Sequence, residues 1–275
     1  ESGDLTQKQR NLLLKKMTNS VSELVLQNNY RQALAISLAE AQTLDKMGEF
    51  RRLIEQLEVD AKLDRELEFI PADDELSERR GNGKGLTRAE LSVVISYCKA
   101  QMKEALVASD LPEDEYAARE LETAFPQELI SRYKSEVYDH RLKREIISTQ
   151  IANHMVNQMG ISFVHRLQLS TGSKPPAIAQ SYILARDVFR LPELWQQIEA
   201  LDNQVGAEVQ AKMMMELQRL VRRASRWFLR NRRLELNTQL EVERFAPQVK
   251  YSLKTWASGC RAVPPKIGVI ATIII

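Results

Sequence analysis

The sequence has few of the residues that interrupt helices, with ten glycines and nine prolines among 275 residues. Together they make up about 7% of the chain, against roughly 12% in an average protein. Glycine destabilises helix interiors and proline breaks them, so a chain short of both is expected to form long helices. Leu, Ala, Glu, Arg, Gln and Met, which are good helix formers, are abundant instead.

The sequence also lacks a disulfide framework, an excess of one charge and a long apolar run. It has two cysteines, Cys98 and Cys260, and such sparse use of cysteine favours a reducing compartment. Thirty-nine basic residues accompany 37 acidic ones, and this balance gives no general attraction to nucleic acid or membrane. No apolar run reaches the roughly 20 residues that span a bilayer. We therefore expect a cytoplasmic protein with no nucleic acid and no membrane among its partners.

Helix starts can be recognised in the first half of the chain. Ser20 with Glu23, and Thr87 with Glu90, have the spacing of a capping box. We expect residues 6–69 to form a run of short helices, and the helix after Thr87 to carry an apolar stripe. The members of this stripe are Leu91, Val94, Ile95, Cys98, Met102, Ala105 and Leu106.

Two longer helices are predicted in the second half. One covers about residues 139–159 and ends at Gly160, and the other covers about residues 207–229. Their inward side chains are expected to be Leu142, Ile146, Ile147, Ile151, Met155 and Met159 in the first, and Met213, Leu217, Leu220, Ala224, Trp227 and Phe228 in the second. Proline costs nothing at a first helical position, where we place Pro112, Pro126 and Pro192.

The predicted fold is all-α, an irregular multi-helix bundle that can be divided into two helical subdomains. Residues 1–80 form the first and residues 86–257 the second, because the glycine-rich stretch 81–85 between them is the best candidate for a boundary or mobile loop. Residues 258–275 end in an apolar, β-branched run, which is either a strand or a tail of doubtful native character. The chain opens on Glu1 without a methionine, so we expect a fragment of a longer protein.

Motifs that would carry chemistry are absent from the sequence. His140, His154 and His165 have no spacing that gathers the three or four ligands of a zinc site. The stretch 81–87 does not fit a phosphate-binding loop, and no G-x-G-x-x-G turn for a dinucleotide occurs. No serine or cysteine has the local signature of a nucleophile. We therefore predict no catalytic residue, no cofactor-binding residue and no metal ligand in this segment.

The strongest local charge feature is a run of arginines without any acid, close to Trp227 and Phe228. It comprises Arg219, Arg222, Arg223, Arg226, Arg230, Arg232 and Arg233. One interpretation is an anion site, for a nucleotide, a nucleic acid or the acidic surface of a partner domain. The other is a solvated helix face whose side-chain stems cover apolar surface. The arginines are the candidate interface of the chain.

Several stretches of the chain, in order, resemble large bacterial NAD-specific glutamate dehydrogenases in the region that follows their catalytic domain. The main ones are residues 5–14, 23–32, 63–71, 78–91, 144–153, 185–189 and 194–203. The family oxidatively deaminates L-glutamate to 2-oxoglutarate and ammonia with NAD. The resemblance implies that the catalytic residues and the NAD site lie upstream of Glu1, so no catalytic residue is carried over. From about Ser258 the sequence departs from the family pattern.

The leading hypothesis is an accessory helical segment of such a dehydrogenase. It would pack on the upstream catalytic domain of the same chain and support a homo-oligomer of the parent enzyme, which would use NAD. An alternative is a free-standing helical interaction module without enzyme activity. A third hypothesis is a nucleic-acid binder that works through the arginines, with an affinity that falls steeply with salt.

Overall fold

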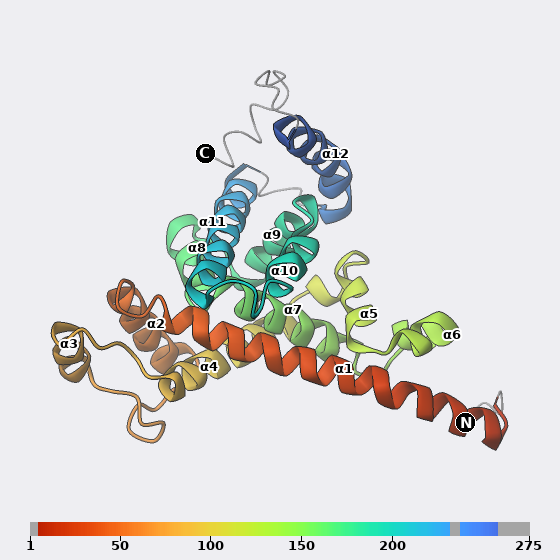
Figure 1. Ribbon diagram of the computed structural model, residues 1–275, viewed down its shortest axis with the longest axis horizontal. Helices are drawn as coiled ribbons and strands as arrows, with labels where there is room; N and C mark the ends of the chain where they lie inside the picture. Colours follow the sequence, from red (N-terminus) through yellow and green to blue (C-terminus); the bar gives the residue numbers. More distant parts are fainter. Residues whose placement is uncertain (1–4, 232–236, 258–275) are drawn as a thin grey trace.

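The computed structural model describes residues 5–231 and 237–257, and within these ranges the chain forms helices and no strand. The prediction of an all-α multi-helix protein is confirmed (Figure 1). The helices are α1 (Gln7–Glu40), α2 (Met47–Asp60), α3 (Asp73–Gly81), α4 (Arg88–Val107), α5 (Leu121–Ala124), α6 (Gln127–Tyr138), α7 (Lys143–Met159), α8 (Phe163–Thr171), α9 (Pro175–Val188), α10 (Leu191–Glu199), α11 (Ala207–Asn231) and α12 (Thr238–Ala257). Two short 3-10 turns, η1 (Leu111–Glu113) and η2 (Ala117–Glu120), precede α5.

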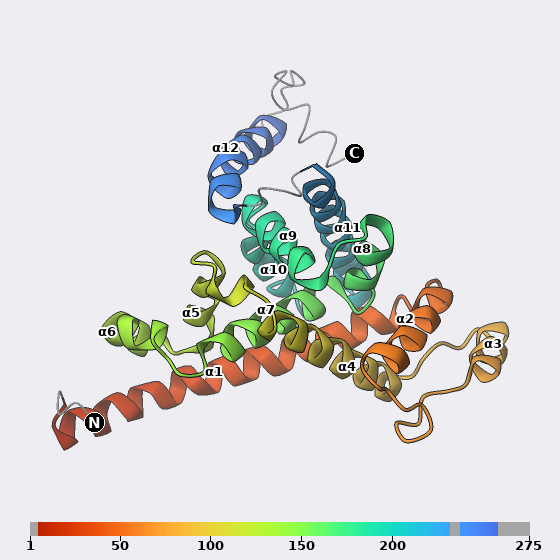
Figure 2. The ribbon, with the colours of Figure 1, turned by 180° about the vertical axis from the view of Figure 1, so that it is seen from behind.

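The first helix is one continuous element of 34 residues, which at 1.5 Å per residue is about 51 Å long. It begins at a capping box between Thr6 and Gln9. The predicted helix start at Ser20 and the predicted run of short helices over residues 7–40 are therefore wrong. Inside the helix the Ser20 hydroxyl has no free backbone amide to cap, and it donates to Glu128 Oε1 at 2.8 Å instead. The N-terminal end of α1 extends past α6, which lies alongside it (Figure 2).

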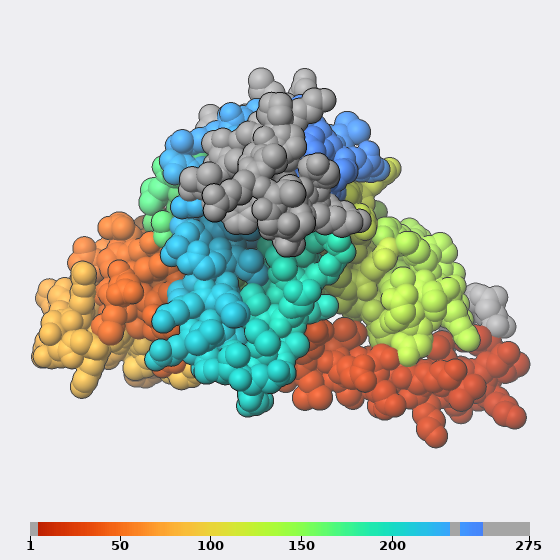
Figure 3. Space-filling view, turned by 45° about the horizontal axis from the view of Figure 1, so that its top comes forward, coloured from red at the N-terminus to blue at the C-terminus, as the bar shows by residue number. Residues whose placement is uncertain are grey.

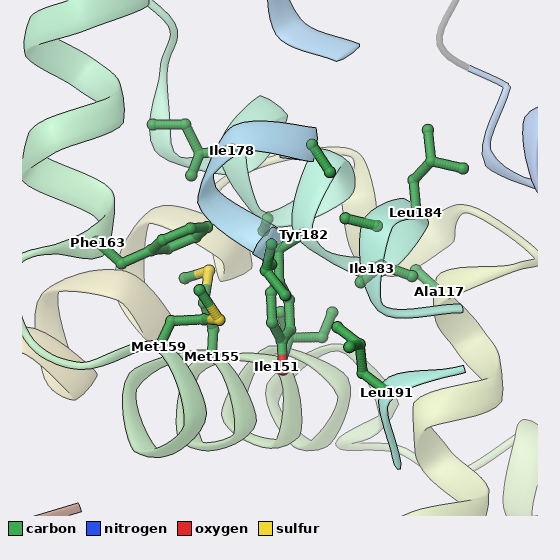
Figure 4. Packing of buried hydrophobic residues seen from close by; sticks show 14 of the residues in the cluster. Ala117, Ile151, Met155, Met159, Phe163, Ile178, Tyr182, Ile183, Leu184 and Leu191 are labelled. Carbon is green, nitrogen blue, oxygen red and sulfur yellow. The ribbon is translucent and has the colours of Figure 1, made fainter. Parts of the chain in front are cut away.

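The larger of two hydrophobic cores is built on α7, α9 and α11, with further side chains from α4, α8 and α10. Tyr182 of α9 is fully buried at its centre, surrounded by Ile151 and Met155 of α7 and by Phe163 of α8 (Figure 4). The rings of Phe163 and Tyr182 meet edge to face, with their centroids 6.1 Å apart. At the far end, Phe228 and Trp227 of α11 pack against Phe245 of α12.

The smaller core lies at the other end of α4, where α2 and the segment around α3 pack. Leu91, Val94 and Cys98 of α4 belong to it, whereas Met102 and Leu106 of the same helix belong to the larger core. The helix that follows the glycine-rich stretch thus contributes to both cores. The division of the chain into two subdomains at residues 81–85 remains a prediction.

Most predicted helix ends are close to those observed. The Thr87 hydroxyl accepts from the amide of Glu90, and the Glu90 carboxylate accepts from the amide of Thr87, as predicted. Gly160, with φ of +80°, ends α7 as predicted, although this helix begins only at Lys143. Pro126 is the residue before α6 rather than its first helical residue.

Two side chains that were expected to point inward are exposed. Leu142 is 54% exposed because α7 starts one residue after it, so it lies on the preceding turn. Met213 is 39% exposed because the next residue, Met214, takes the buried position on α11. The apolar tail predicted beyond Ser258 lies outside the described residues.

Candidate functional site

The N-terminal half of α1 carries more exposed large apolar side chains than any other helix in the described ranges. Its exposed side chains, between 37% and 67% accessible, are Leu12, Leu14, Val21, Leu24, Val25 and Leu26. Leu14, Val21 and Val25 recur at spacings of seven and four residues, so they share one face of the helix. The other end of α1 is anchored, because Leu38 and Ala39 belong to the two cores and Ala35 is buried as well. Clustered exposed apolar residues of this kind mark an interaction surface.

A groove of about 1510 Å³ runs between this half of α1 and the body of the molecule. Val21, Leu24 and Val25 of α1 line one side, and residues of η2, α6, α7, α9 and α10 line the others. In Figure 3 the teal residues of α10 and the yellow-green residues of α6 border the red helix α1. Arg31 of α1 and Glu199 of α10 form an ion pair across this border at 3.6 Å.

The floor of the groove is a polar face of α7. Its residues, spaced three and four apart along the helix, are Gln150, Asn153, His154, Asn157 and Gln158. Asn157 and Gln158 are 6% and 5% exposed, and their side-chain oxygens Oδ1 and Oε1 accept no hydrogen bond from the described residues. A buried polar group left without a partner costs about 1–3 kcal/mol. The floor therefore has hydrogen-bonding capacity that these residues do not use.

A buried network of charges stabilises the inner wall of the groove. Glu120 Oε1 lies 2.7 Å from Arg186 Nη2, and Arg186 Nε lies 2.7 Å from Asp187 Oδ1. His154 Nδ1 is 3.5 Å from the second oxygen of Glu120, and Tyr116 Oη donates to Asp187 at 2.9 Å. Burial alone would raise the pKa of Glu120, but Arg186 and His154 lower it to about 2. Burial alone would lower the pKa of Arg186, but Glu120 and Asp187 raise it, so the pair stays ionised and holds η2 against α9.

The arginines of the candidate interface lie on α11, and the structure describes five of the seven. Arg219, Arg223, Arg226 and Arg230 are exposed, and Arg222 is partly buried. Arg232 and Arg233 lie outside the described residues. Arg219 pairs with Glu216 on its own helix at 2.8 Å, and Arg230 donates to the backbone carbonyl of Ser170 at 3.0 Å. These two contacts are internal, so part of the arginine run has a structural role.

Further basic groups approach the arginines from neighbouring elements. Arg166 of α8 pairs with Glu49 of α2 at 3.1 Å. Burial and the guanidinium of Arg166 lower the pKa of Arg222. Lys46 lies in the same region and donates a hydrogen bond to Gln42, and burial lowers its pKa. This end of α11 is therefore positively charged beyond what the arginine run itself contributes.

The three histidines have separate structural environments. His154 pairs with Glu120, His165 is buried against the side chain of Gln56, and His140 accepts from the backbone amide of Leu142. The part of the chain that the structure describes holds no group of three His, Cys, Asp or Glu residues that could bind a metal ion. In the same part, no helix is both long enough and apolar enough to cross a membrane.

Comparison with known protein families identifies the family of this chain. The family model described as glutamate dehydrogenase, C-terminal, matches residues 83–258. The chain belongs to this family. A second model, described as bacterial NAD-glutamate dehydrogenase, catalytic domain, matches residues 1–39, which include all of α1 except its last residue, Glu40. The long helix is thus matched by the catalytic-domain model, while the body from the end of α3 onward is matched by the C-terminal model.

Relatives with similar sequences carry the name NAD-specific glutamate dehydrogenase. The one from Pseudomonas aeruginosa is 53% identical over 249 residues, the one from Halomonas elongata is 52% identical over 247 residues, and the one from Mycobacterium tuberculosis is 30% identical over 249 residues. Each match covers 90% of this chain but only 15% of the relative. The resemblance expected from the sequence is confirmed, and the chain corresponds to a small C-terminal part of proteins of this family.

The groove was not predicted from the sequence, although the polar residues of its floor form a recognisable pattern. The amides and histidine of α7 recur on one face at helical spacing, which is a recognisable polar stripe. The rest of the groove could not be seen, because no local pattern shows that residues 20–31 of α1 lie opposite residues 150–158 of α7. Since α1 was expected to be several short helices, its exposed apolar surface was missed as well.

Proposed function

We propose that this chain is the accessory C-terminal segment of a cytoplasmic, homo-oligomeric NAD-dependent glutamate dehydrogenase. The parent enzyme would oxidatively deaminate L-glutamate to 2-oxoglutarate and ammonia on its upstream catalytic domain, which would also bind the NAD. The segment would contribute no catalytic residue. The observation that carries the proposal is α1, which is matched by the catalytic-domain model and continues without a break into the helical body.

This continuity suggests how a helical body without its own active site could affect the enzyme. One end of α1 is fixed by Leu38 and Ala39 in the cores, and the other half of the helix exposes apolar side chains. A rigid helix shared in this way couples the position of the body to that of the catalytic domain. The body would then stabilise one arrangement of the domain or of the oligomer through contacts that the other arrangements lack.

The decisive experiment is a truncation of the full-length enzyme directly after Glu40, which keeps α1 and removes the helical body. We expect the truncated enzyme to lose most of its glutamate-dependent NADH formation or to assemble abnormally in size-exclusion chromatography with light scattering. NAD binding, measured by fluorescence, would show whether the catalytic domain itself is still folded. A truncated enzyme with unchanged activity and unchanged assembly would refute an accessory role.

The arginine face of α11 remains the proposed contact for an acidic surface of the catalytic domain. Its support is the exposure of Arg223 and Arg226 together with the basic groups that gather around Arg222. Replacing Arg223 and Arg226 by Glu in the full-length enzyme should weaken assembly or activity, increasingly so at low salt, where charges are less screened. Arg132→Glu together with Arg141→Glu, two exposed arginines outside α11, is the matched control. Equal effects of the two changes would favour a solvated face.

A further inference from the structure

The groove beside α1 lies where the two family matches meet. Its α1 side, on which Val21, Leu24 and Val25 lie among polar residues, belongs to the residues matched by the catalytic-domain model. Its polar floor, with Asn157 and Gln158, belongs to the residues matched by the C-terminal model. The groove therefore lies between an element matched by the catalytic-domain model and the helical body.

The chemistry of the two sides restricts the occupant. The α1 side needs apolar groups, because Val21 and Val25 are 43% and 52% exposed. The α7 floor needs hydrogen-bond donors, because the side-chain oxygens of Asn157 and Gln158 are buried without a partner. A lipid chain would leave the amides unsatisfied, and a small ion would leave the valines in water. A polypeptide segment carries both kinds of group, apolar side chains and regularly spaced backbone N–H groups.

We propose that the groove binds a segment of the catalytic domain that precedes this chain in the parent enzyme. The segment packs apolar side chains on Val21, Leu24 and Val25 and donates hydrogen bonds to Asn157 and Gln158. The proposal rests on the function proposed above. The catalytic domain is favoured over a second copy because it is joined covalently to the projecting end of α1, which places it beside the groove at a high effective concentration.

The proposal can be tested by photo-cross-linking in the full-length enzyme. Benzoylphenylalanine is incorporated at Val25, and separately at Leu24, so that one poorly expressed variant does not decide the result. The control position is Leu169 of α8, which is 70% exposed and does not line the groove. Mass spectrometry of the digest identifies the partner peptide. We expect cross-links from Val25 and Leu24 to the same peptides of the catalytic domain, and none from Leu169 to those peptides.

A second measurement reports coverage of the groove without a cross-linker. Val25→Cys and Leu169→Cys are made in the full-length enzyme, and their labelling by a maleimide is compared with that of the unsubstituted enzyme. We expect the thiol at position 25 to react at least about tenfold more slowly than the thiol at position 169, because a buried thiol is inaccessible. Equal labelling rates would overturn the proposal.

The outcomes separate this inference from the proposed function. Cross-links from Val25 only to peptides of a second copy of the helical body, or no cross-links at all, would overturn the catalytic-domain occupant. If truncation after Glu40 still impaired the enzyme in that case, the accessory function would stand and the contact would lie elsewhere. If truncation had no effect but the cross-links formed as expected, the groove assignment would hold and the accessory function would fail.

Discussion

Removing one partner of the buried Glu120–Arg186 ion pair should destabilise the chain far more than removing an exposed pair of the same length. The Glu120 pKa falls from 4.5 to about 2 in the folded chain. Each pKa unit corresponds to about 1.4 kcal/mol, so this shift corresponds to about 3 kcal/mol in the free energy of unfolding. Glu120→Gln removes that contribution and leaves Arg186 buried with Asp187 as its remaining ion-pair partner, so a loss of about 3–5 kcal/mol is expected.

The assay is urea unfolding of the chain followed by far-UV circular dichroism, with a double-mutant cycle. Glu120→Gln, Arg186→Met and the double variant are compared, and the double variant should lose less stability than the sum of the single ones. The control is Glu193→Gln, because Glu193 pairs with Arg190 at 2.6 Å with both side chains more than half exposed. That change should cost less than about 1 kcal/mol. A coupling energy below about 1 kcal/mol between Glu120 and Arg186 would refute the reasoning.

The same pair predicts the direction of a pH dependence. A carboxylate whose folded pKa lies below its unfolded value contributes stability that is fully present above the unfolded pKa and is lost as the pH falls through the folded pKa. The contribution of Glu120 should therefore be complete above about pH 4.5 and disappear as the pH approaches about 2. Glu120→Gln should show a flatter stability profile over this range, and parallel profiles would contradict the assignment.

Two smaller predictions concern the glycine-rich stretch and the buried thiol. Gly85→Ala should destabilise the chain by about 1–3 kcal/mol, because the new Cβ would lie 2.0 Å from the side chain of buried Thr43. Gly81 has open space around it, so Gly81→Ala should be close to neutral in the same urea titration. Burial raises the pKa of Cys98 to about 12, so in a Cys260→Ser background a thiol reagent should react with it only when urea unfolds the chain; fast reaction in the native state would contradict its burial.

Local features of this fold could be predicted from the sequence, because the interactions that produce them span few residues. The capping box at Thr87 and the end of α7 at Gly160 depend on neighbours within one helical turn. The supposed start at Ser20 shows the limit of such patterns. A serine followed three residues later by a glutamate can occur inside a helix as well as at its start. The sequence sign that Ser20 lies inside a helix is the absence of glycine and proline from residues 4–47.

The candidate site was less predictable, because its parts come from distant segments. The arginine run is continuous in sequence, so it could be located, but the internal contact of Arg230 with Ser170 could not. The pairing of Glu120 with Arg186 joins residues on η2 and α9 that carry no shared pattern. The groove requires α1 and α7 to lie side by side, which depends on the packing of the cores rather than on either helix alone.

The unbroken course of α1 sets a mechanical constraint on its two ends. In an α-helix, length and orientation cannot change independently, because each added residue advances the chain by about 1.5 Å and turns it by about 100°. One residue inserted between the buried Ala35 and the groove-lining Val25 would rotate Val21, Leu24 and Val25 away from the groove. The same insertion between the exposed residues Glu66 and Leu67, in the loop between α2 and α3, would cost little. The number of residues in α1 therefore fixes the direction in which its groove-lining side chains point. The helix should tolerate substitutions far better than insertions or deletions.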